Sequence, residues 1–299
     1  MRITDNYASS RAVTQLSSLR EAIAQMQDQV TTGKRFQNPS DDPVAANGVL
    51  RNDSQQRAIT QYRTGIATAK RRVDLEDGVL QQLNDILGRA REIAVQQGDS
   101  TASSQARQQA VSEVNGLISQ VVSLANTKDA DEFLFGGAQS TTAPYAVDIT
   151  NPNYSFTTGG ASGTRAIEIG SGDRIIAHHD GATIFGTAAG GLLKSLTDLN
   201  TALQSGVATN VAGTLQGLDT ATQNLQGLVA ETGARGARLD MADTNLGAFS
   251  SQLAASSSTL QDADLAAAMT ALVSRQTSYQ AAMAATSRVL SMSLVQYLK

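Results

Sequence analysis

Residues 59–94 read ITQYRTGIATAKRRVDLEDGVLQQLNDILGRAREIA, with a core-type side chain at every third or fourth position. Alternating gaps of three and four residues return side chains to one face of a helix, which is the pattern of a coiled-coil seam. The seam consists of Ile59, Tyr62, Ile66, Ala69, Val73, Glu76, Leu80, Leu83, Leu87, Ala90 and Ala94. At about 1.5 Å per residue, this predicts one helix roughly 50 Å long.

Toward the N-terminus, the segment TTGKRFQNPSDDPVAANG (Thr31–Gly48) interrupts the heptads. A phosphate-binding loop needs a glycine four residues before its Gly-Lys pair and a hydroxyl after it, and this segment has neither. A metal site needs carboxylates at ligand-like offsets, whereas the two aspartates here are adjacent. A helix corner explains more residues, because it uses a glycine C-cap, cap acceptors and a proline in the first turn. The corner and cap residues are Gly33, Ser40, Asp41, Asp42 and Pro43.

Helical seams also occupy both chain ends and predict that the terminal helices pair antiparallel. Burying a leucine side chain is worth roughly 1.5–3 kcal/mol, so neither apolar stripe is expected to stay in water. Polar residues interrupt the C-terminal seam, which weakens a lone pair and favours packing among neighbouring copies. The assembly positions are Leu16, Leu19, Ile23, Met26, Val30, Leu265, Met269, Leu272, Tyr279, Met283, Leu290 and Leu294.

Between the helical parts, residues 138–189 follow a period of two, with Tyr145, Val147 and Ile149 in one run, separated by glycine-rich turns. The predicted fold is mainly α: long heptad-patterned helices from both chain ends form a discontinuous coiled-coil bundle with a small β-rich insertion. We expect three domains. These are a terminal coiled-coil inner domain (1–40 plus 262–299), a helical rod (41–137 plus 190–261) and a β-rich outer domain (138–189).

Composition excludes several function classes. With 27 acidic and 23 basic residues the net charge is −4, so no basic surface for nucleic acid is expected. The Lys70–Arg72 run is interpreted as a solvated helix face. There is no cysteine, no tryptophan, no secretory signal and no membrane-spanning stretch. Taken alone, these features predict a cytoplasmic protein.

The only histidines, His178 and His179, precede Asp180 and raise the question of a metal or acid–base site. Adjacent residues on a strand point to opposite faces, so they do not readily share one ion. The following Asp180-Gly181 pair indicates a hairpin turn. Motifs such as G-x-S-x-G and H-E-x-x-H do not occur. The sequence therefore predicts no enzyme, no cofactor and no metal.

Five segments together resemble the flagellin family. They are the corner segment, LGRAREIAVQQGDST (Leu87–Thr101), DEFLFGG (Asp131–Gly137), ETGARGARLD (Glu231–Asp240) and the tail YQAAMAATSRVLSMSLVQYLK (Tyr279–Lys299). Filament flagellins usually carry a DDAAG-like corner and a Leu-Leu-Arg-like tail. Here the corner continues Pro43-Val44 and the chain ends Tyr297-Leu298-Lys299, which favours a hook–filament junction member over the alternative, a filament subunit.

The resemblance implies a structural role in the bacterial flagellum. Its implied partners are identical copies in a ring, the first hook-associated protein on the hook side, flagellin on the filament side and a cytoplasmic export chaperone. It also implies type III export without a cleaved signal, which replaces the cytoplasmic expectation with an extracellular one. Two other classes stay open: a chemoreceptor-like signalling coiled coil, for which the β insertion is unexpected, and an enzyme using the histidines.

Overall fold

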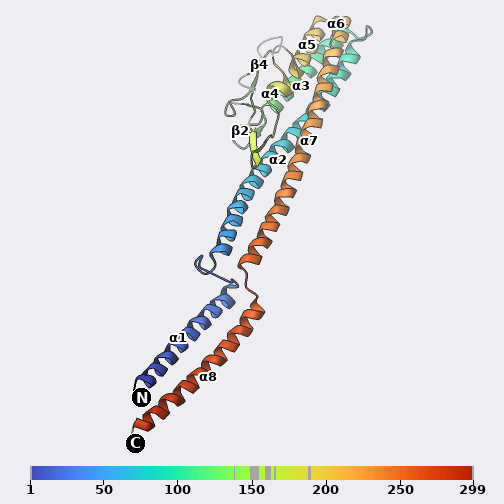
Figure 1. Cartoon of the computed structure of the whole chain (residues 1–299). Coiled ribbons are helices and arrows are strands. Elements are labelled where there is room, and N and C mark those ends of the chain that lie inside the picture. Colours follow the sequence, from blue (N-terminus) through green and yellow to red (C-terminus); the bar gives the residue numbers. More distant parts are fainter. Residues whose placement is uncertain are drawn as a thin grey trace. The chain divides into compact units, whose positions relative to one another are not determined.

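The seam at residues 59–94 lies within a single helix, α2 (Pro43–Gln97), in the computed structural model (Figure 1). Every seam residue except Tyr62 is buried, so the heptad pattern identified the inward face of this helix. The structure describes residues 2–137, 139–148, 155–158, 163–164, 166–187 and 190–297. It is built from long helices of both chain halves with a small insertion of short antiparallel strands, which confirms the predicted fold class.

The chain forms two units. The first contains residues 1–58 and 248–299, and the second contains residues 59–247. The boundary between them falls inside α2 and inside α7 (Leu215–Gln261). The three-domain division expected from the sequence places its boundaries elsewhere and stays a prediction.

In the first unit, α1 (Arg2–Thr32) and α8 (Leu265–Tyr297) lie side by side and run antiparallel (Figure 1). The parts of α2 and α7 that belong to this unit are joined by side-chain hydrogen bonds. Asn52 donates from Nδ2 to the hydroxyls of Ser256 and Ser257, each at 3.1 Å. Close helix approach is possible because Gly48 faces Leu260, where a β-carbon would come within 2.8 Å of Leu260 Cδ1.

In the second unit, four helices share the main hydrophobic core: α2, α3 (Ser104–Ala125), α5 (Leu192–Ser205) and α7. A short helix, α6 (Ala208–Gly213), leads from α5 into α7. A turn after α2 leads into α3, and Ser103 caps α3 by accepting the amide N–H of Ala106 at 3.1 Å. On α5, Leu192, Leu196, Leu199 and Leu203 are buried at helical spacing.

Among the described residues, three separate antiparallel hairpins and one short helix lie between α3 and α5. Strand β1 (Lys128–Asp129) pairs with β2 (Glu132–Phe133) ahead of the predicted insertion. Within the insertion, β3 (Tyr145–Asp148) pairs with β4 (Ser155–Thr158), and β5 (Ala166–Gly170) with β6 (Asp173–Ile176). Helix α4 (Gly181–Phe185) follows. We call β3 to β6 together with α4 the strand module. The predicted strand position Ile149 lies outside the described residues.

Two apolar contacts hold the strand module on the helices. The hairpin β5–β6 buries Ile169, Ile175 and the following Ala177 against Ile66, Ala69 and Val73 of α2 and Leu239 of α7. Farther along, Tyr145, Ile184 and Phe185 of the module belong to the main hydrophobic core that the helices share. There the rings of Phe135 and Tyr145 both meet Phe185 edge-on, at centroid distances of 5.2 and 5.5 Å. Tyr145 also donates its hydroxyl to the carbonyl of Gly186 at 3.0 Å. The module is therefore anchored at both ends.

The basic run Lys70–Arg72 is a solvated face only in part: the side chains of Lys70 and Arg71 are 40 and 56% exposed, whereas that of Arg72 is 13% exposed. Arg71 and Arg72 both pair with Asp129, at 2.8 and 3.1 Å, and Arg72 also pairs with Glu132 at 2.9 Å. Lys70 pairs with Asp240 of α7. The Asp129 side chain is only 6% exposed, and its pKa is held below the ordinary value chiefly by the hydrogen bond from Arg71. The interpretation failed for Arg72 because Asp129 is 57 residues away in sequence.

Candidate assembly site

The corner between α1 and α2 begins where the sequence predicted. Gly33 has a φ of +69°, a left-handed conformation that glycine adopts without a side-chain clash, and donates its N–H to Gln29 O at 2.9 Å. The chain then bonds to the connection between α7 and α8. Arg35 donates its N–H to Gln261 O at 2.6 Å, and Ala263 donates to Gly33 O at 2.8 Å. These two hydrogen bonds join the corner to the connection that precedes α8.

Asp42 is the residue that caps α2. Its Oδ1 accepts the N–H of Ala45 at 3.0 Å, and its Oδ2 pairs with Arg35 at 2.8 Å. Pro43 is the first residue of the helix, where its missing N–H leaves no bond unmade. Asp41 closes the preceding turn by accepting the N–H of Asn38 at 3.2 Å. The Ser40 hydroxyl turns to Asp41 at 3.4 Å instead of to the helix.

A small apolar cluster lies behind this cap. Phe36, Ala45 and Ala46 are buried together and pack against the half-buried Val49 and Leu260. Phe36 therefore anchors the corner, although sequence reasoning did not single it out. The sequence gives little indication that Phe36 is buried, because a single aromatic residue in a polar loop forms no periodic pattern.

Replacing Asp42 with alanine should lower the free energy of unfolding by about 1 kcal/mol, because the first turn of α2 loses its cap. The measurement is urea unfolding followed by helical circular dichroism. Asp53→Ala is the matched control, since Asp53 lies on the surface of the same helix and makes only an exposed pair with Arg57 at 3.3 Å. The Asp53→Ala substitution should lower the free energy of unfolding by less than about 0.5 kcal/mol. Equal losses in the two variants would contradict the cap.

The terminal helices meet along the face predicted for α1. Its five seam positions, Leu16, Leu19, Ile23, Met26 and Val30, are all half-buried. On α8, the side toward α1 carries the buried Ala268 and the half-buried Leu272 and Tyr279. None of these seam positions on α1 reaches the burial of the main core. The pair alone therefore leaves part of each side chain in water.

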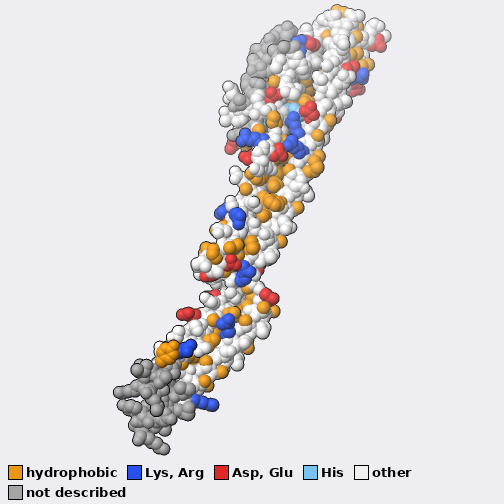
Figure 2. Space-filling model, viewed as in Figure 1, with side chains coloured by type: hydrophobic (Ala, Val, Ile, Leu, Met, Phe, Trp, Pro, Cys, Tyr) orange, Lys and Arg blue, Asp and Glu red, His pale blue; other side chains and the backbone are white. Residues whose placement is uncertain are grey.

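Three of the positions predicted for α8 are not covered by α1. Leu265, Met269 and Met283 are 47, 56 and 49% exposed, and the neighbouring Val273 is 62% exposed. These four residues form what we call the outer stripe of α8, and hydrophobic side chains are visible at the surface of this helix in Figure 2. Leu290 and Leu294 belong to α8, but their side chains lie outside the described part of the chain.

Helix geometry explains the difference. At 100° per residue, Leu265 to Val273 sweeps about 80° around the helix. The face toward α1 instead includes the small residues Ala268 and Ala271, which allow close approach. A single partner helix covers only one stripe, so the larger side chains beside it stay exposed. The sequence did not distinguish these two stripes because both satisfy a spacing of three and four.

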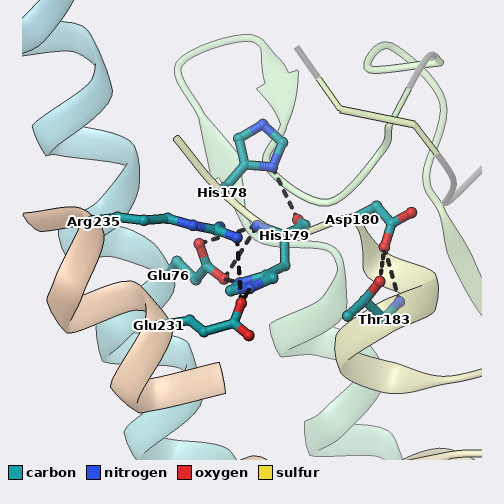
Figure 3. Close-up of polar contacts among 7 residues, drawn as sticks. All are labelled: Glu76, His178, His179, Asp180, Thr183, Glu231 and Arg235. Carbon is teal, nitrogen blue, oxygen red and sulfur yellow. Dashed lines mark hydrogen bonds and ion pairs between the residues drawn. The ribbon is translucent and has the colours of Figure 1, made fainter. Parts of the chain in front are cut away.

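The histidine pair lies in the second unit and is arranged differently from the prediction (Figure 3). Residues 177–180 are not a strand, and both histidines are buried. Asp180 does not begin a hairpin turn but caps α4, where its Oδ1 accepts the N–H of Thr183 at 3.0 Å. The alternation rule failed because it applies only to extended strands.

His179 bridges two helices of the second unit. Its Nδ1 lies 2.5 Å from Glu76 Oε1 on α2, and its Nε2 lies 2.9 Å from Glu231 Oε2 on α7. Burial lowers the pKa of His179, but the hydrogen bonds to both carboxylates outweigh burial and raise it above the usual 6.5. His178 donates from Nδ1 to the backbone carbonyl of His179 at 3.0 Å, and burial lowers the pKa of His178.

These side chains do not form a recognisable reaction centre. Within the described residues, no group of three or more His, Asp or Glu side chains is arranged to hold a metal ion. In the same described part of the chain, no helix is both long and apolar enough to span a membrane. The prominent features are instead the paired terminal helices, the capped corner and the outer stripe.

Such features define a mainly helical protein in which the helices of the two chain ends pair antiparallel. The family model described as the bacterial flagellin N-terminal helical region matches residues 3–140, and that of the flagellin C-terminal helical region matches residues 215–298. The chain therefore belongs to the flagellin family, as the sequence motifs indicated.

Curated relatives fall into two groups within this family. Flagellar hook-associated protein 3 of Escherichia coli is 35% identical over 40% of this chain and 38% of its own length. The protein of the same name from Salmonella typhimurium is 28% identical over 62% of this chain and 57% of its own length. A flagellin of Listeria monocytogenes is 25% identical over 90% of this chain and 88% of its own length. The chain thus spans between about two fifths and three fifths of the length of these hook-associated relatives.

Solved structures have the same fold. A putative flagellar hook-associated protein from Vibrio parahaemolyticus superposes with a TM-score of 0.66 at 21% identity, covering 74% of this chain and all of its own. The flagellar junction protein FlgL from Legionella pneumophila gives 0.59 at 16% identity, covering 72% and 100%. At these identities the likeness establishes the fold.

Proposed function

We propose that this protein is a structural subunit of the bacterial flagellum that joins the hook to the filament. The outer stripe of α8 carries the proposal, because four large apolar side chains on one helix stay 47 to 62% exposed. Burying them against other copies is worth roughly 1.5–3 kcal/mol per fully buried side chain. A subunit made for assembly explains this exposed surface.

Two hook-associated relatives favour the junction role within the family. The two hook-associated proteins are 35 and 28% identical where they align, against 25% for the flagellin. The departures in the corner at Pro43-Val44 and in the tail support the same choice. We infer that the partners are identical copies in a ring, the first hook-associated protein on the hook side and flagellin on the filament side.

A filament subunit is the second candidate. It is favoured by one specific observation, which is that the flagellin alignment covers 90% of this chain. The two candidates differ in abundance: a filament protein would dominate sheared flagella, whereas a junction protein would be a trace component.

We infer that assembly uses the positions predicted from the sequence on the two terminal helices. We place Leu16, Ile23 and Val30 of α1 and Leu272 and Tyr279 of α8 in the pair within one chain. The outer stripe, together with Leu290 and Leu294, contacts neighbouring copies. We also keep the three-part division, with residues 1–40 and 262–299 as the assembling domain.

The proposed life cycle follows from this location. The chain leaves the cell through the flagellar type III channel without a cleaved signal, held beforehand by a cytoplasmic chaperone at its C-terminal helix. It works outside the cell as part of the flagellum and acts without catalysis or cofactor.

Deletion of the gene with complementation tests the role. The junction proposal predicts intact hooks, no attached filaments and flagellin shed into the medium, all restored by the wild-type gene. The filament alternative predicts hooks without any flagellin in the medium, provided that no second flagellin gene is expressed. Filaments still attached in the deletion strain, with no second copy of the gene present, would refute the junction role.

A further inference from the structure

Glu76 is a charged residue in a position that the heptad pattern assigns to the core. Its carboxylate is fully buried on α2, in the seam that also contains Val73 and Leu80. A buried carboxylate is costly unless it is paired with a cation and hydrogen-bonded. Both Glu76 oxygens accept the backbone N–H of His179 at 3.2 Å, and Oε1 also contacts the ring. Glu76 therefore depends on residue 179 for its charge balance.

The imidazole of His179 faces an acceptor on each side. A carboxylate oxygen lies against Nδ1 and another against Nε2, and an ionised carboxylate accepts hydrogen bonds without donating any. A neutral imidazole carries one N–H and can satisfy only one of these contacts. The doubly bonded geometry therefore requires the imidazolium, which donates from both nitrogens (Figure 3).

We propose that Glu76, His179 and Glu231 form a pH-sensitive latch, which fastens residues 177–180 of the insertion to α2 and α7 while His179 is protonated and loosens when it is not. The latch lies between the two apolar anchors of the strand module, the β5–β6 hairpin and the Phe185 contact. Loss of the latch would loosen residues 177–180, but the two apolar contacts would still hold the strand module on the helices.

The charged groups around His179 set the direction of the effect. Burial favours the neutral ring, and Arg235 on α7 acts in the same direction, whereas Glu76 and Glu231 favour the cation. Arg72 on α2 and the neighbouring His178 are also nearby, and Asp180 turns its carboxylate to α4. The pKa of His179 is raised in the folded state, so its stabilising effect is complete below pH 6.5 and is lost as the pH rises through the folded value.

Glu231 has a second possible partner when His179 is neutral and the latch is open. Its Oε2 also lies 3.6 Å from Arg235 Nη2, one helical turn further along α7. Glu231 is 64% exposed and can turn to Arg235 when the imidazolium is lost. Glu76 cannot turn away because it is buried. When His179 loses its proton, Glu76 therefore loses its cationic partner, and the contact between Glu76 and the backbone around residue 179 weakens.

Proton NMR of the two imidazole rings tests the latch directly, because the chain contains only two histidines. The His178→Gln variant leaves His179 as the only ring to titrate. We expect its pKa to lie above 6.5, to fall clearly in Glu76→Gln, and to fall less in Glu231→Gln because that carboxylate is exposed. A His179 ring that titrates at or below 6.5 in the folded His178→Gln protein would overturn the proposal.

Unfolding in urea across pH provides the second readout. The stability gap between the wild type and His179→Gln should be largest below pH 6.5 and shrink as the pH rises. His178→Gln is the matched control, since it is an equally buried neighbouring histidine without a carboxylate partner, and its gap should not shrink in this range. A constant gap for His179→Gln would contradict the latch. If His179→Gln does not fold, the titration of the His179 ring in His178→Gln decides alone.

Discussion

Replacing Val273 with aspartate is expected to abolish incorporation into the flagellum while leaving the isolated chain folded. Val273 is 62% exposed in the single chain, so the α1–α8 pair does not depend on it. In an assembly its surroundings become apolar, and an unpaired carboxylate buried there costs several kcal/mol at every copy. The measurement is complementation of the deletion strain, scored by attached filaments in electron micrographs and by swimming.

Ser274→Asp is the matched control for this experiment. Ser274 is also exposed on α8, but it points about 100° further around the helix, away from the outer stripe. It should restore filaments normally. Export is measured separately, as the amount of each variant in the medium, because the C-terminal helix is also the proposed chaperone site. A Val273→Asp protein that is exported and assembles like the wild type would remove the outer stripe from the interface.

Replacing Leu83 with alanine is expected to lower the free energy of unfolding by about 2–5 kcal/mol. Leu83 is completely buried on α2, within the core that the helices of the second unit share. The substitution removes its transfer free energy and leaves a cavity that a helical bundle closes only in part. Urea unfolding followed by circular dichroism, with hydrogen exchange to locate the loss, measures the effect.

Leu50→Ala provides the comparison for Leu83, because Leu50 belongs to the same helix but is 58% exposed. It should change stability by no more than about 0.5 kcal/mol. Similar losses for both leucines would mean that the heptad seam does not define the interior of α2.

Periodicity predicted those parts of the fold in which one helix face meets one core. The seam from Ile59 to Ala94 needed only the spacing of its apolar residues, and its burial follows because 3.6 residues per turn return them to one side. The prediction that Gly33 ends a helix also depended only on nearby residues, since a glycine after an apolar run and before polar residues suits a left-handed cap. Such features depend on neighbours within about one turn.

The errors arose wherever a partner came from far along the chain. Lys70–Arg72 was interpreted as solvated because its acidic partners Asp129 and Asp240 lie in other elements. His179 was interpreted as a strand residue because nothing nearby in sequence indicates that Glu76, 103 residues away, and Glu231 converge on it. The carboxylate at position 76 was the available signal, as a charged residue in an otherwise apolar seam calls for a buried partner.

The amino-acid sequence by itself determined the long helices, their inward faces, the corner with its cap, and the family. It could do so because helix period, capping and turn chemistry are set by residues close together in the chain. Only the tertiary structure decided which of two apolar stripes on α8 meets α1 and which stays open, since both have helical spacing. It also decided that a histidine would join two distant carboxylates, because such a contact depends on how separate elements pack.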